Sequence, residues 1–385
     1  MKGKDFVKKY TMVLALILVF ILFTILTGGR LIMAQNISNL LLQNAYVLVM
    51  ASGMLLCILT GGNVDLSVGS TLCLSAAIAA KLMQTNHSSA TAVIVALLIS
   101  AVIGLWQGWL VGYVHIPPFI CTLAGMFLFR GIARTILDSK TISISKEGFL
   151  NLFTSYIQIK GVDHLGNCPS AMVIGIIIAI FISIFMIADR GKKAKQGYQV
   201  ASMGSTIAKV IIFDILIIAY SYELMGYKGV PVMVIWILVV VLIFGFITEK
   251  TVFGRYFYAV GGNEKATKLS GIDPRMVYFW AYFLMSVLAG LSGLLVGARI
   301  GSVDGNMGNS YEMDAIASCF IGGASAYGGS GKIPGVMVGA ILLGVINMGM
   351  SILGLPDQYQ YIVKGAVLLA AVIFDVVTNH KTGKS

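Results

Sequence analysis

Residues 60–70 read TGGNVDLSVGS and separate two strongly apolar segments. Residues 321–332 read IGGASAYGGSGK and also open with a double glycine between apolar segments. Backbone that leaves the helical conformation at membrane depth finds no water, so it must line a cavity or be buried in protein. The two interruptions therefore predict broken helices with a role in a pathway or gate. The alternative is that both are ordinary turns at the membrane surface.

The composition indicates a membrane protein. Of the 385 residues, 58% are apolar and 11% are charged, against roughly 25% charged in an average soluble domain. The mean hydropathy is +0.90. A membrane-spanning helix takes about 20 residues, so about twelve spans use about 240 positions and leave no room for a separate catalytic domain. The 44 glycines suit close contact between helices in lipid, where small residues let backbones approach.

The apolar segments predict an all-α polytopic membrane protein, with residues 1–385 as a single transmembrane domain. The twelve predicted spans are Thr11–Thr27, Ala45–Leu59, Leu66–Met83, Ala90–Tyr113, Phe119–Leu137, Ala171–Ala188, Ile207–Tyr222, Pro231–Ile247, Met276–Arg299, Met313–Ala326, Ile333–Leu353 and Tyr361–Val377. This order brings the chain into residues 60–70 and 321–332 from the same side, which argues against an inverted repeat between them.

The basic residues predict the topology. Sixteen of the 27 Lys and Arg residues fall in residues 1–10, 190–209, 248–275 and 378–385. Cytoplasmic loops are enriched in Lys and Arg, so these segments are predicted to be cytoplasmic, with both termini inside. Residues 138–169 are then the one long extracytoplasmic loop. The net charge of +11 is explained by this topology and requires no nucleic-acid partner.

The chain shows no catalytic or cofactor-binding pattern. The sequence GGSGK at residues 328–332 lacks the first glycine and the final Ser or Thr of a phosphate-binding loop. The four histidines are scattered in loops and at span ends, without a metalloprotease or triad context. The five cysteines show no CxxC spacing and predict packing positions. We therefore expect no enzyme activity, no metal and no cofactor bound by this chain.

The predicted cytoplasmic loop 248–275 has the pattern of a short capped helix. In the run GGNEKATKLSG, Asn263 can cap the helix, Glu264 suits its positive end and Leu269 supplies an apolar anchor. Gly271 ends the helix. A short helix in a cytoplasmic loop is suited to docking a soluble partner. The alternative is a helix that lies on the lipid surface.

Three motifs together resemble one family. They are GGNVDLSVGS from Gly61, GGNEKATKLSGI from Gly261, and the glycines of residues 322–329. Over about residues 36–375 the chain is similar to bacterial ABC sugar-import permeases of the ribose, xylose and galactose type, and it is closest to the xylose (multiple-sugar) branch. The resemblance implies a ten-span core, to which residues 171–222 add two spans, making twelve.

The resemblance also implies partners and a location. It implies a homodimer of permeases that forms one pathway, an extracytoplasmic sugar-binding protein and a cytoplasmic ATPase that binds ATP and magnesium, in the bacterial inner (plasma) membrane. The cargo is then a monosaccharide such as xylose, ribose or galactose. The residues that match the family's coupling loop, which contacts the ATPase, are Gly262, Asn263, Glu264, Lys265, Ala266, Leu269 and Gly271.

Polar residues near breaks and within spans are candidates for the pathway or its gates. They are Asn63, Asp65, Ser67, Arg130, Asp314, Ser325, Tyr327 and Asn347. Intramembrane carboxylates are functional candidates by default, and Asp65 and Asp314 could bind sugar hydroxyls or instead cap the broken helices. Arg130 could face the pathway or snorkel to headgroups, and Lys364 is expected to snorkel outward. Asn347 could face the pathway or bridge two helices.

Two other functions stay open at this point. A branched-chain amino acid or nucleoside permease shares the glycine-rich breaks, but its sequence is expected to differ from that of residues 261–272. An ion-coupled secondary transporter needs several buried carboxylates with His or Lys partners, and here only Asp65 and Asp314 are plausible candidates.

Overall fold

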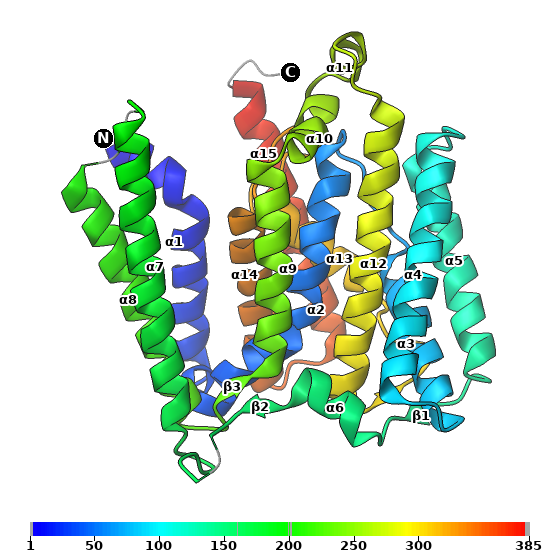
Figure 1. Ribbon diagram of the computed structural model, residues 1–385, viewed down its shortest axis with the longest axis horizontal. Helices are drawn as coiled ribbons and strands as arrows, with labels where there is room; N and C mark the ends of the chain where they lie inside the picture. Colours follow the sequence, from blue (N-terminus) through cyan, green and yellow to red (C-terminus); the bar gives the residue numbers. More distant parts are fainter. Residues whose placement is uncertain (1–2, 160, 199, 201, 382–385) are drawn as a thin grey trace.

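The structure, a computed structural model, describes residues 3–159, 161–198, 200 and 202–381, and these residues form an all-helical protein (Figure 1). Its α-helices are α1 (Gly3–Leu26), α2 (Ala34–Leu59), α3 (Val68–Gln84), α4 (Ser89–Gly112), α5 (Pro118–Ile136), α6 (Glu147–Thr154), α7 (Pro169–Lys195), α8 (Met203–Met225), α9 (Val232–Lys250), α10 (Val252–Gly262), α11 (Glu264–Leu269), α12 (Pro274–Ile300), α13 (Tyr311–Ile321), α14 (Ile333–Ile352) and α15 (Asp357–Lys381). A short 3-10 helix, η1 (Arg30–Ile32), precedes α2. The predicted all-α class is confirmed.

Eight of the described helices are long and apolar enough to cross a bilayer: α2, α4, α5, α7, α8, α9, α12 and α14. Shorter apolar stretches lie in α1 and α3. The twelve predicted spans each overlap a helix, but α13 has only 11 residues. At 1.5 Å per residue it is roughly 16 Å long, against a hydrocarbon core of about 30 Å. The predicted span Met313–Ala326 is therefore wrong in its second part, because the helix ends at Ile321.

The bundle has two distinct ends (Figure 1). The described start of α1, the end of α15, the helices α10 and α11 and the connection from α7 to α8 lie at one end, which we call the α11 end. The connection from α5 to α7, which contains α6, lies at the opposite end, which we call the α6 end. The described parts of the four Lys- and Arg-rich segments thus share one end of the molecule.

The centre of the bundle is built from α2, α3, α4 and α12. Within the most apolar windows of α2 and α12, 83% and 67% of the residues are buried. Gly104, Gly108 and Gly112 lie four residues apart on one face of α4, and a Cβ atom on any of them would come within 2.8 Å of a backbone oxygen of α12. Lipid gives helices no hydrophobic drive to associate, so this close backbone contact is a main source of their packing.

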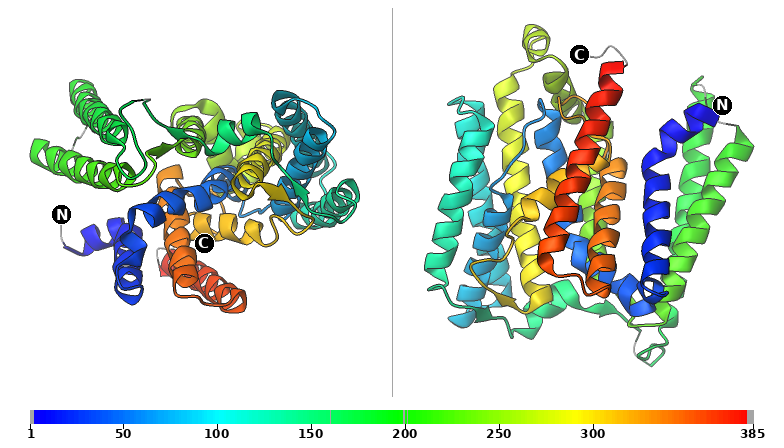
Figure 2. Two further views of the ribbon diagram at one scale, coloured as in Figure 1. Left: turned by 90° about the horizontal axis from the view of Figure 1, so that it is seen from below. Right: turned by 180° about the vertical axis from the view of Figure 1, so that it is seen from behind.

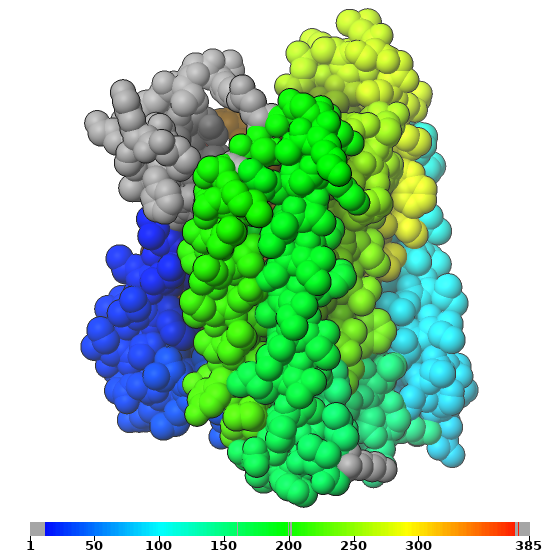
Figure 3. Space-filling model, turned by 60° about the vertical axis from the view of Figure 1, so that its left-hand side comes forward, coloured from blue at the N-terminus to red at the C-terminus, as the bar shows by residue number. Residues whose placement is uncertain are grey.

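Helices α7 and α8 form a hairpin that packs mainly on itself. The Ser183 hydroxyl donates a hydrogen bond to Asp214 Oδ2 (2.8 Å) across the hairpin, and Gly175 lies against Ser221. Only 17% and 11% of the apolar windows of α7 and α8 are buried, so both helices present most of their surface outward along their length (Figure 3). The hairpin includes the segment 171–222, which was expected to extend a ten-span core.

The α6 end is covered by the connection between α5 and α7. Strand β1 (Ile142–Ser143) pairs antiparallel with β4 (Ser302–Val303). Strand β2 (Tyr156–Ile157) pairs antiparallel with β3 (Val230–Pro231). Between β1 and β2, the amphipathic helix α6 buries both of its phenylalanines completely. The connection is thereby attached both to the start of α9 and to the segment that follows α12.

Candidate translocation pathway and coupling surface

Residues 60–67 join α2 to α3 without helical structure, and we call this segment the first break. Asp65 is fully buried, and its Oδ1 accepts hydrogen bonds from the Ser67 backbone N–H (2.8 Å) and hydroxyl (2.6 Å). The Ser67 hydroxyl accepts from Gln107 Nε2 of α4 (2.8 Å). The Ser286 hydroxyl of α12 donates to Gln107 Oε1 (3.2 Å). The structure thus places the candidates Asp65 and Ser67 in a buried network that holds the break against two neighbouring helices.

A second break lies between α12 and α13, at residues 301–310. Gly301 ends α12 with φ +72°, and Ser310 precedes α13 with φ +64°. Arg130 of α5 donates from Nη1 to two backbone oxygens of this segment. Arg134 Nη2 donates to a side-chain amide oxygen of the same segment (3.0 Å). Arg130 therefore binds the second break instead of snorkelling to lipid headgroups.

The two breaks enter the bundle from opposite ends. Helix α2 runs toward the α11 end and α12 toward the α6 end, and the chain then turns back toward the middle (Figure 2). The first turns of α3 and α13 meet there. A Cβ atom on Gly69 would lie 2.2 Å from the Gly308 oxygen, and one on Gly308 would lie 2.5 Å from the Gly69 oxygen. The structural counterpart of the first break is thus residues 301–310. The shared double glycine had instead indicated residues 321–332 as the counterpart.

Both breaks contain the same local hydrogen bond. Asp304 Oδ1 accepts from the Asn306 backbone N–H (2.7 Å), as Asp65 Oδ1 accepts from that of Ser67. A carboxylate bonded to the backbone two residues later forms an Asx turn, which competes with helical structure. The spacing Asp-x-Asn or Asp-x-Ser is the one trace of the second break in the sequence, but ordinary surface turns contain it as well.

Charged side chains are paired beside the second break. Lys364 of α15 forms an ion pair with Asp314 of α13, with Nζ 2.9 Å from Oδ1. Tyr46 of α2 donates its hydroxyl to Asp314 Oδ2 (2.7 Å), and its ring stacks on Tyr311 with centroids 3.9 Å apart. The expectation that Lys364 snorkels outward is therefore wrong, because its charge is paired inside the bundle. Asp314 links α13 to α2 and α15.

A cavity of about 210 Å³ with polar and apolar lining residues lies between α5 and the second break. Its lining residues are Met126, Phe127, Arg130, Arg134, Asn306, Asn309 and Glu312. A further cavity of about 430 Å³ shares Arg134 and Asn306 with the first and reaches Thr141 in the connection toward α6. We call the two cavities together the α5 groove. It brings guanidinium, amide and carboxylate groups together beside the start of α13.

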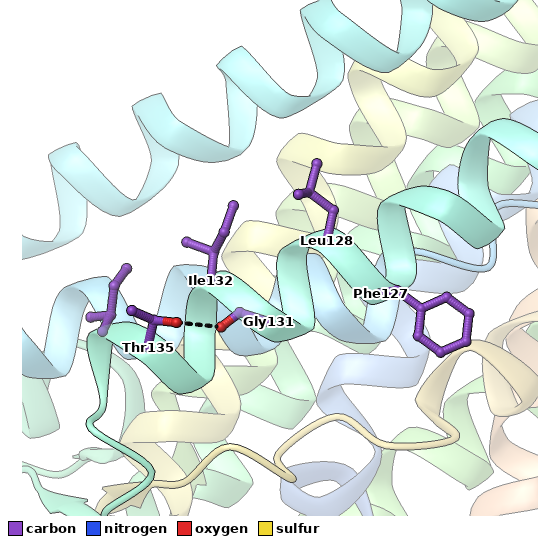
Figure 4. A pocket seen from close by; sticks show the side chains of 6 residues that line it. Phe127, Leu128, Gly131, Ile132 and Thr135 are labelled. Atoms are coloured by element: carbon purple, nitrogen blue, oxygen red, sulfur yellow. Dashed lines mark hydrogen bonds between the residues drawn. The ribbon is translucent and has the colours of Figure 1, made fainter.

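The rest of the α5 surface near the groove is apolar. Phe127 is 69% exposed and Leu128 is 48% exposed. With Ile132 they line a shallow depression of about 400 Å³ (Figure 4). The hydrogen bond in this depression, from the Thr135 hydroxyl to the Gly131 carbonyl (3.0 Å), lies within α5 itself. Helix α5 therefore carries a polar face toward the second break and an apolar face beside it.

Three candidate gate residues lie together at the α11 end. Asn63 Nδ2 donates to a backbone oxygen of its own turn (3.1 Å), and Ser325 Oγ accepts from the Tyr327 backbone N–H (3.2 Å). Tyr327 is 60% exposed. The structure packs their two segments against each other, since a Cβ atom on Gly62 would lie 1.9 Å from the Ala326 oxygen.

The last pathway candidate, Asn347, lies within α14 and is half-buried. Its side-chain oxygen makes no hydrogen bond with the part of the chain that the structure describes. Its backbone oxygen accepts from the Ser351 hydroxyl (2.9 Å). Asn347 is not among the residues that line the α5 groove.

The candidate coupling residues form one exposed loop at the α11 end. Asn263 Oδ1 accepts from the Ala266 backbone N–H (2.9 Å) and caps α11 as predicted. The Tyr278 hydroxyl of α12 donates to Glu264 (3.0 Å), which ties α11 to the bundle. Leu269 is 89% exposed, so it does not anchor α11 to its own chain. Helix α11 projects beyond the ends of its neighbours (Figure 1), and all seven coupling candidates are exposed.

The described residues include no group of three or more His, Cys, Asp or Glu side chains that could hold a metal ion. All five cysteines are buried and free, which agrees with packing positions in a bundle.

Comparisons with known proteins identify the family. Residues 36–372 match the family described as branched-chain amino acid transport system / permease component. The chain belongs to this family. It is 33% identical to the xylose transport system permease protein XylH of Haemophilus influenzae, over 97% of each chain. It is 32% identical to XylH of Escherichia coli, over 97% of this chain and 93% of the relative.

The chain is also 33% identical to the ribose import permease protein RbsC of Escherichia coli, over 89% of this chain and 85% of the relative. No solved structure matches. The resemblance to sugar-import permeases, and to the xylose branch in particular, is confirmed by these relatives.

Proposed function

We propose that this chain is the transmembrane permease subunit of an ATP-driven ABC importer that moves a monosaccharide, such as xylose or ribose, into the cytoplasm. Relatives named as xylose and ribose permeases match most of its length. The observation that carries the proposal is the α5 groove, which gathers Arg130, Asn306, Asn309 and Glu312 on one face of the bundle. The relatives favour this cargo over branched-chain amino acids or nucleosides.

The chemistry of the groove suits a polyol. Each sugar hydroxyl both donates and accepts hydrogen bonds. Arg130 supplies donors, Glu312 supplies acceptors, and the amides of Asn306 and Asn309 supply both. The guanidinium of Arg130 is already engaged with backbone oxygens of the second break. A sugar in the groove would therefore bind weakly, which suits a pathway that must release its cargo.

The groove lies on a face that we propose is covered by a second copy of the chain. Charged groups at membrane depth face protein or a water-filled cavity, because exposure to hydrocarbon is costly. Helix α5, the second break, α13 and α15 lie on the same side of the bundle (Figure 2, right). The exposed Phe127 and Leu128 offer apolar contact area at the margin of the groove. Two copies that meet on this face would enclose one pathway between their grooves.

The α11 end is the cytoplasmic end in this proposal, because the Lys- and Arg-rich segments lie there. The exposed residues around α11 then dock a separate ATPase, which holds ATP and magnesium. The α6 end faces an extracytoplasmic sugar-binding protein. The protein sits in the bacterial inner membrane with both termini inside, and hydrolysis belongs to the ATPase.

The candidate residues divide into three roles. Arg130 lines the pathway. Asp65, Ser67 and Asp314 position the half-helices, as their buried hydrogen bonds support. Asn63, Ser325 and Tyr327 lie where an inner gate would be, at the cytoplasmic end of the first break. ATP binding and sugar delivery each favour one arrangement of these parts, so transport is a shift between two access states.

Uptake of labelled xylose and ribose into membrane vesicles tests the function. Vesicles contain the permease alone, the permease with its ATPase, or both with the sugar-binding protein. We expect uptake only when the ATPase and ATP are present, and we expect it to survive collapse of the proton and sodium gradients. Uptake by the permease alone that vanishes with either gradient would identify a secondary transporter instead.

The coupling role is tested by the double variant Glu264→Arg with Gly271→Trp. It reverses one charge and adds bulk on the exposed loop, so the ATPase should no longer co-purify with the permease. Glu147→Arg is the matched control, because it reverses an exposed charge at the α6 end. Normal ATPase binding and uptake in the double variant would rule out this docking surface.

A further inference from the structure

Three double glycines that are far apart in the sequence meet at the α11 end: Gly61 with Gly62, Gly261 with Gly262, and Gly328 with Gly329. A Cβ atom on Gly261 would lie 1.7 Å from the Leu59 oxygen and 2.6 Å from the Gly329 nitrogen. A Cβ atom on Gly328 would lie 2.4 Å from Gly61 Cα. The three backbones therefore touch with no side chain between them. We call this contact the glycine junction.

Two hydrogen bonds hold the glycine junction. The Gly329 backbone N–H donates to the oxygen of Leu59, the last residue of α2 (3.0 Å). The hydroxyl of Tyr258, one turn before the end of α10, donates to the Gly331 oxygen (2.9 Å). Helix α10 therefore contacts the end of α2 through backbone packing. It contacts residues 328–331 through both packing and a side-chain hydrogen bond.

Each segment of the junction leads to a part of the site. Leu59 ends α2 and is followed by the first break and α3. Residues 322–331 follow α13, which starts at the second break. Gly261 lies in the last turn of α10, directly before the exposed coupling loop. The junction is thus a contact between the coupling loop and the chain segments that carry both half-helices.

Backbone contact transmits displacement well. A contact between long side chains can absorb a small shift by changing rotamers, whereas close-packed groups without side chains must move together. We propose that the glycine junction transmits movement of the docked ATPase to α3 and α13. This inference rests on the proposed function. It makes Gly261 and Tyr258 coupling residues that contact neither sugar nor ATP.

Gly261→Ala tests the proposal, with Gly204→Ala as its matched control. Each residue lies in a terminal turn of a helix, Gly261 in α10 and Gly204 in α8, and neither has a positive φ. Gly204 is exposed outside the coupling loop and the glycine junction, and a Cβ atom on it would have no neighbour within 4 Å. The complete transporter, with permease, ATPase and sugar-binding protein, is reconstituted in vesicles. Xylose or ribose uptake and ATP hydrolysis are then measured together. ATP-dependent uptake by the wild type is established first, so that failure of the proposed function is recognised separately.

We expect Gly261→Ala to keep the ATPase bound but to lower the sugar transported per ATP hydrolysed by about tenfold or more, within the range of measured couplings between sites. Gly204→Ala should stay within about twofold of the wild type, as for an exposed substitution. If the Gly261→Ala transporter moved as much sugar per ATP hydrolysed as its control variant, the proposal would be overturned.

Tyr258→Phe provides a second test that leaves the packing in place. It removes the hydroxyl bonded to the Gly331 oxygen and keeps the ring. The sugar transported per ATP should fall by about two- to tenfold, as expected for one hydrogen bond, while ATPase binding is unchanged. An unchanged ratio contradicts the proposal. If Gly261→Ala fails to assemble, this variant decides the question.

Discussion

The first and second breaks bring two half-helices to one point by different means. The first break is held by Asp65, Ser67 and Gln107, which are all fully buried. The second break is held by Arg130 and Arg134 of α5, and its polar side lines the α5 groove. The first break is therefore part of the fixed core, whereas the second break lies at an accessible polar surface where cargo could pass.

The two breaks are also connected to opposite ends of the molecule. The first break begins at the glycine junction, beside the proposed coupling loop of the α11 end. The second break begins at β4, which pairs with β1 of the α6 end, and Ile144 donates its backbone N–H to the Gly301 oxygen (2.8 Å). A partner on either side of the membrane would therefore act first on a different break.

The largest expected effect concerns the ion pair beside the second break; among the described residues, the first break has no such pair. Lys364→Met leaves the Asp314 carboxylate, whose side chain is 2% exposed, without its positive partner. Breaking a buried pair costs about 3–5 kcal/mol, so the melting temperature of the purified permease should fall clearly. The double variant with Asp314→Leu should recover most of this loss. Equal stability of the wild type and Lys364→Met would show that the pair does not hold α13.

The next effect compares the two Asx turns directly. Asp65→Ala leaves the buried Ser67 N–H and hydroxyl without their acceptor, which should cost about 2–3 kcal/mol. Asp304→Ala removes the same bond to Asn306 at an exposed position and should cost less than about 1 kcal/mol. Thermal unfolding of both variants checks the difference. Equal losses of stability in Asp65→Ala and Asp304→Ala would mean that burial does not make the first Asx turn more stabilising than the second.

Arg130→Gln is expected to change transport more than stability. It removes charged hydrogen bonds to the second break, worth about 1.5–3 kcal/mol. The initial rate of sugar uptake per folded permease should therefore fall roughly 10- to 100-fold. Gln107→Leu is the corresponding change at the first break and should lower the melting temperature instead. The comparison fails if Arg130→Gln destabilises the protein while its uptake rate per folded molecule is unchanged.

Arg134→Gln should have the smallest effect. Its hydrogen bonds to the second break are exposed, and exposed interactions of this kind are worth less than about 1 kcal/mol, or about fivefold in rate. The same uptake assay measures it beside Arg130→Gln. If Arg134→Gln lowered the uptake rate more than Arg130→Gln, the part of the groove that matters most for transport would lie closer to the α6 end.

Features that depend on neighbours in the sequence were predictable. The cap of α11 by Asn263 follows from the preference of helix starts for Asn. The first break follows from a double glycine and a carboxylate between apolar runs. The approximate positions of the long helices follow from apolar length, although α2 begins at Ala34 and not at Ala45. The span predicted to reach Ala326 ends as a helix at Ile321, directly before a double glycine.

Features that depend on distant partners were not predictable. Lys364 was expected to snorkel because the acid that it pairs with lies 50 residues earlier in the chain. The second break was overlooked because its Asp-x-Asn turn is short and polar, and resembles an ordinary surface loop until Arg130, about 175 residues away, is seen to bind it. Leu269 was expected to anchor α11, but its exposure depends on what packs beneath that helix.

The sequence by itself determined that this protein is an all-helical membrane permease, because apolar run length, the distribution of Lys and Arg and the local glycine motifs are properties of adjacent residues. Only the tertiary structure decided that residues 301–310 form the second break, that α3 and α13 meet, and that three double glycines share one contact. These contacts join backbone segments that lie up to hundreds of residues apart in the sequence. Because glycine has no side chain, its residue type does not indicate which segment it contacts.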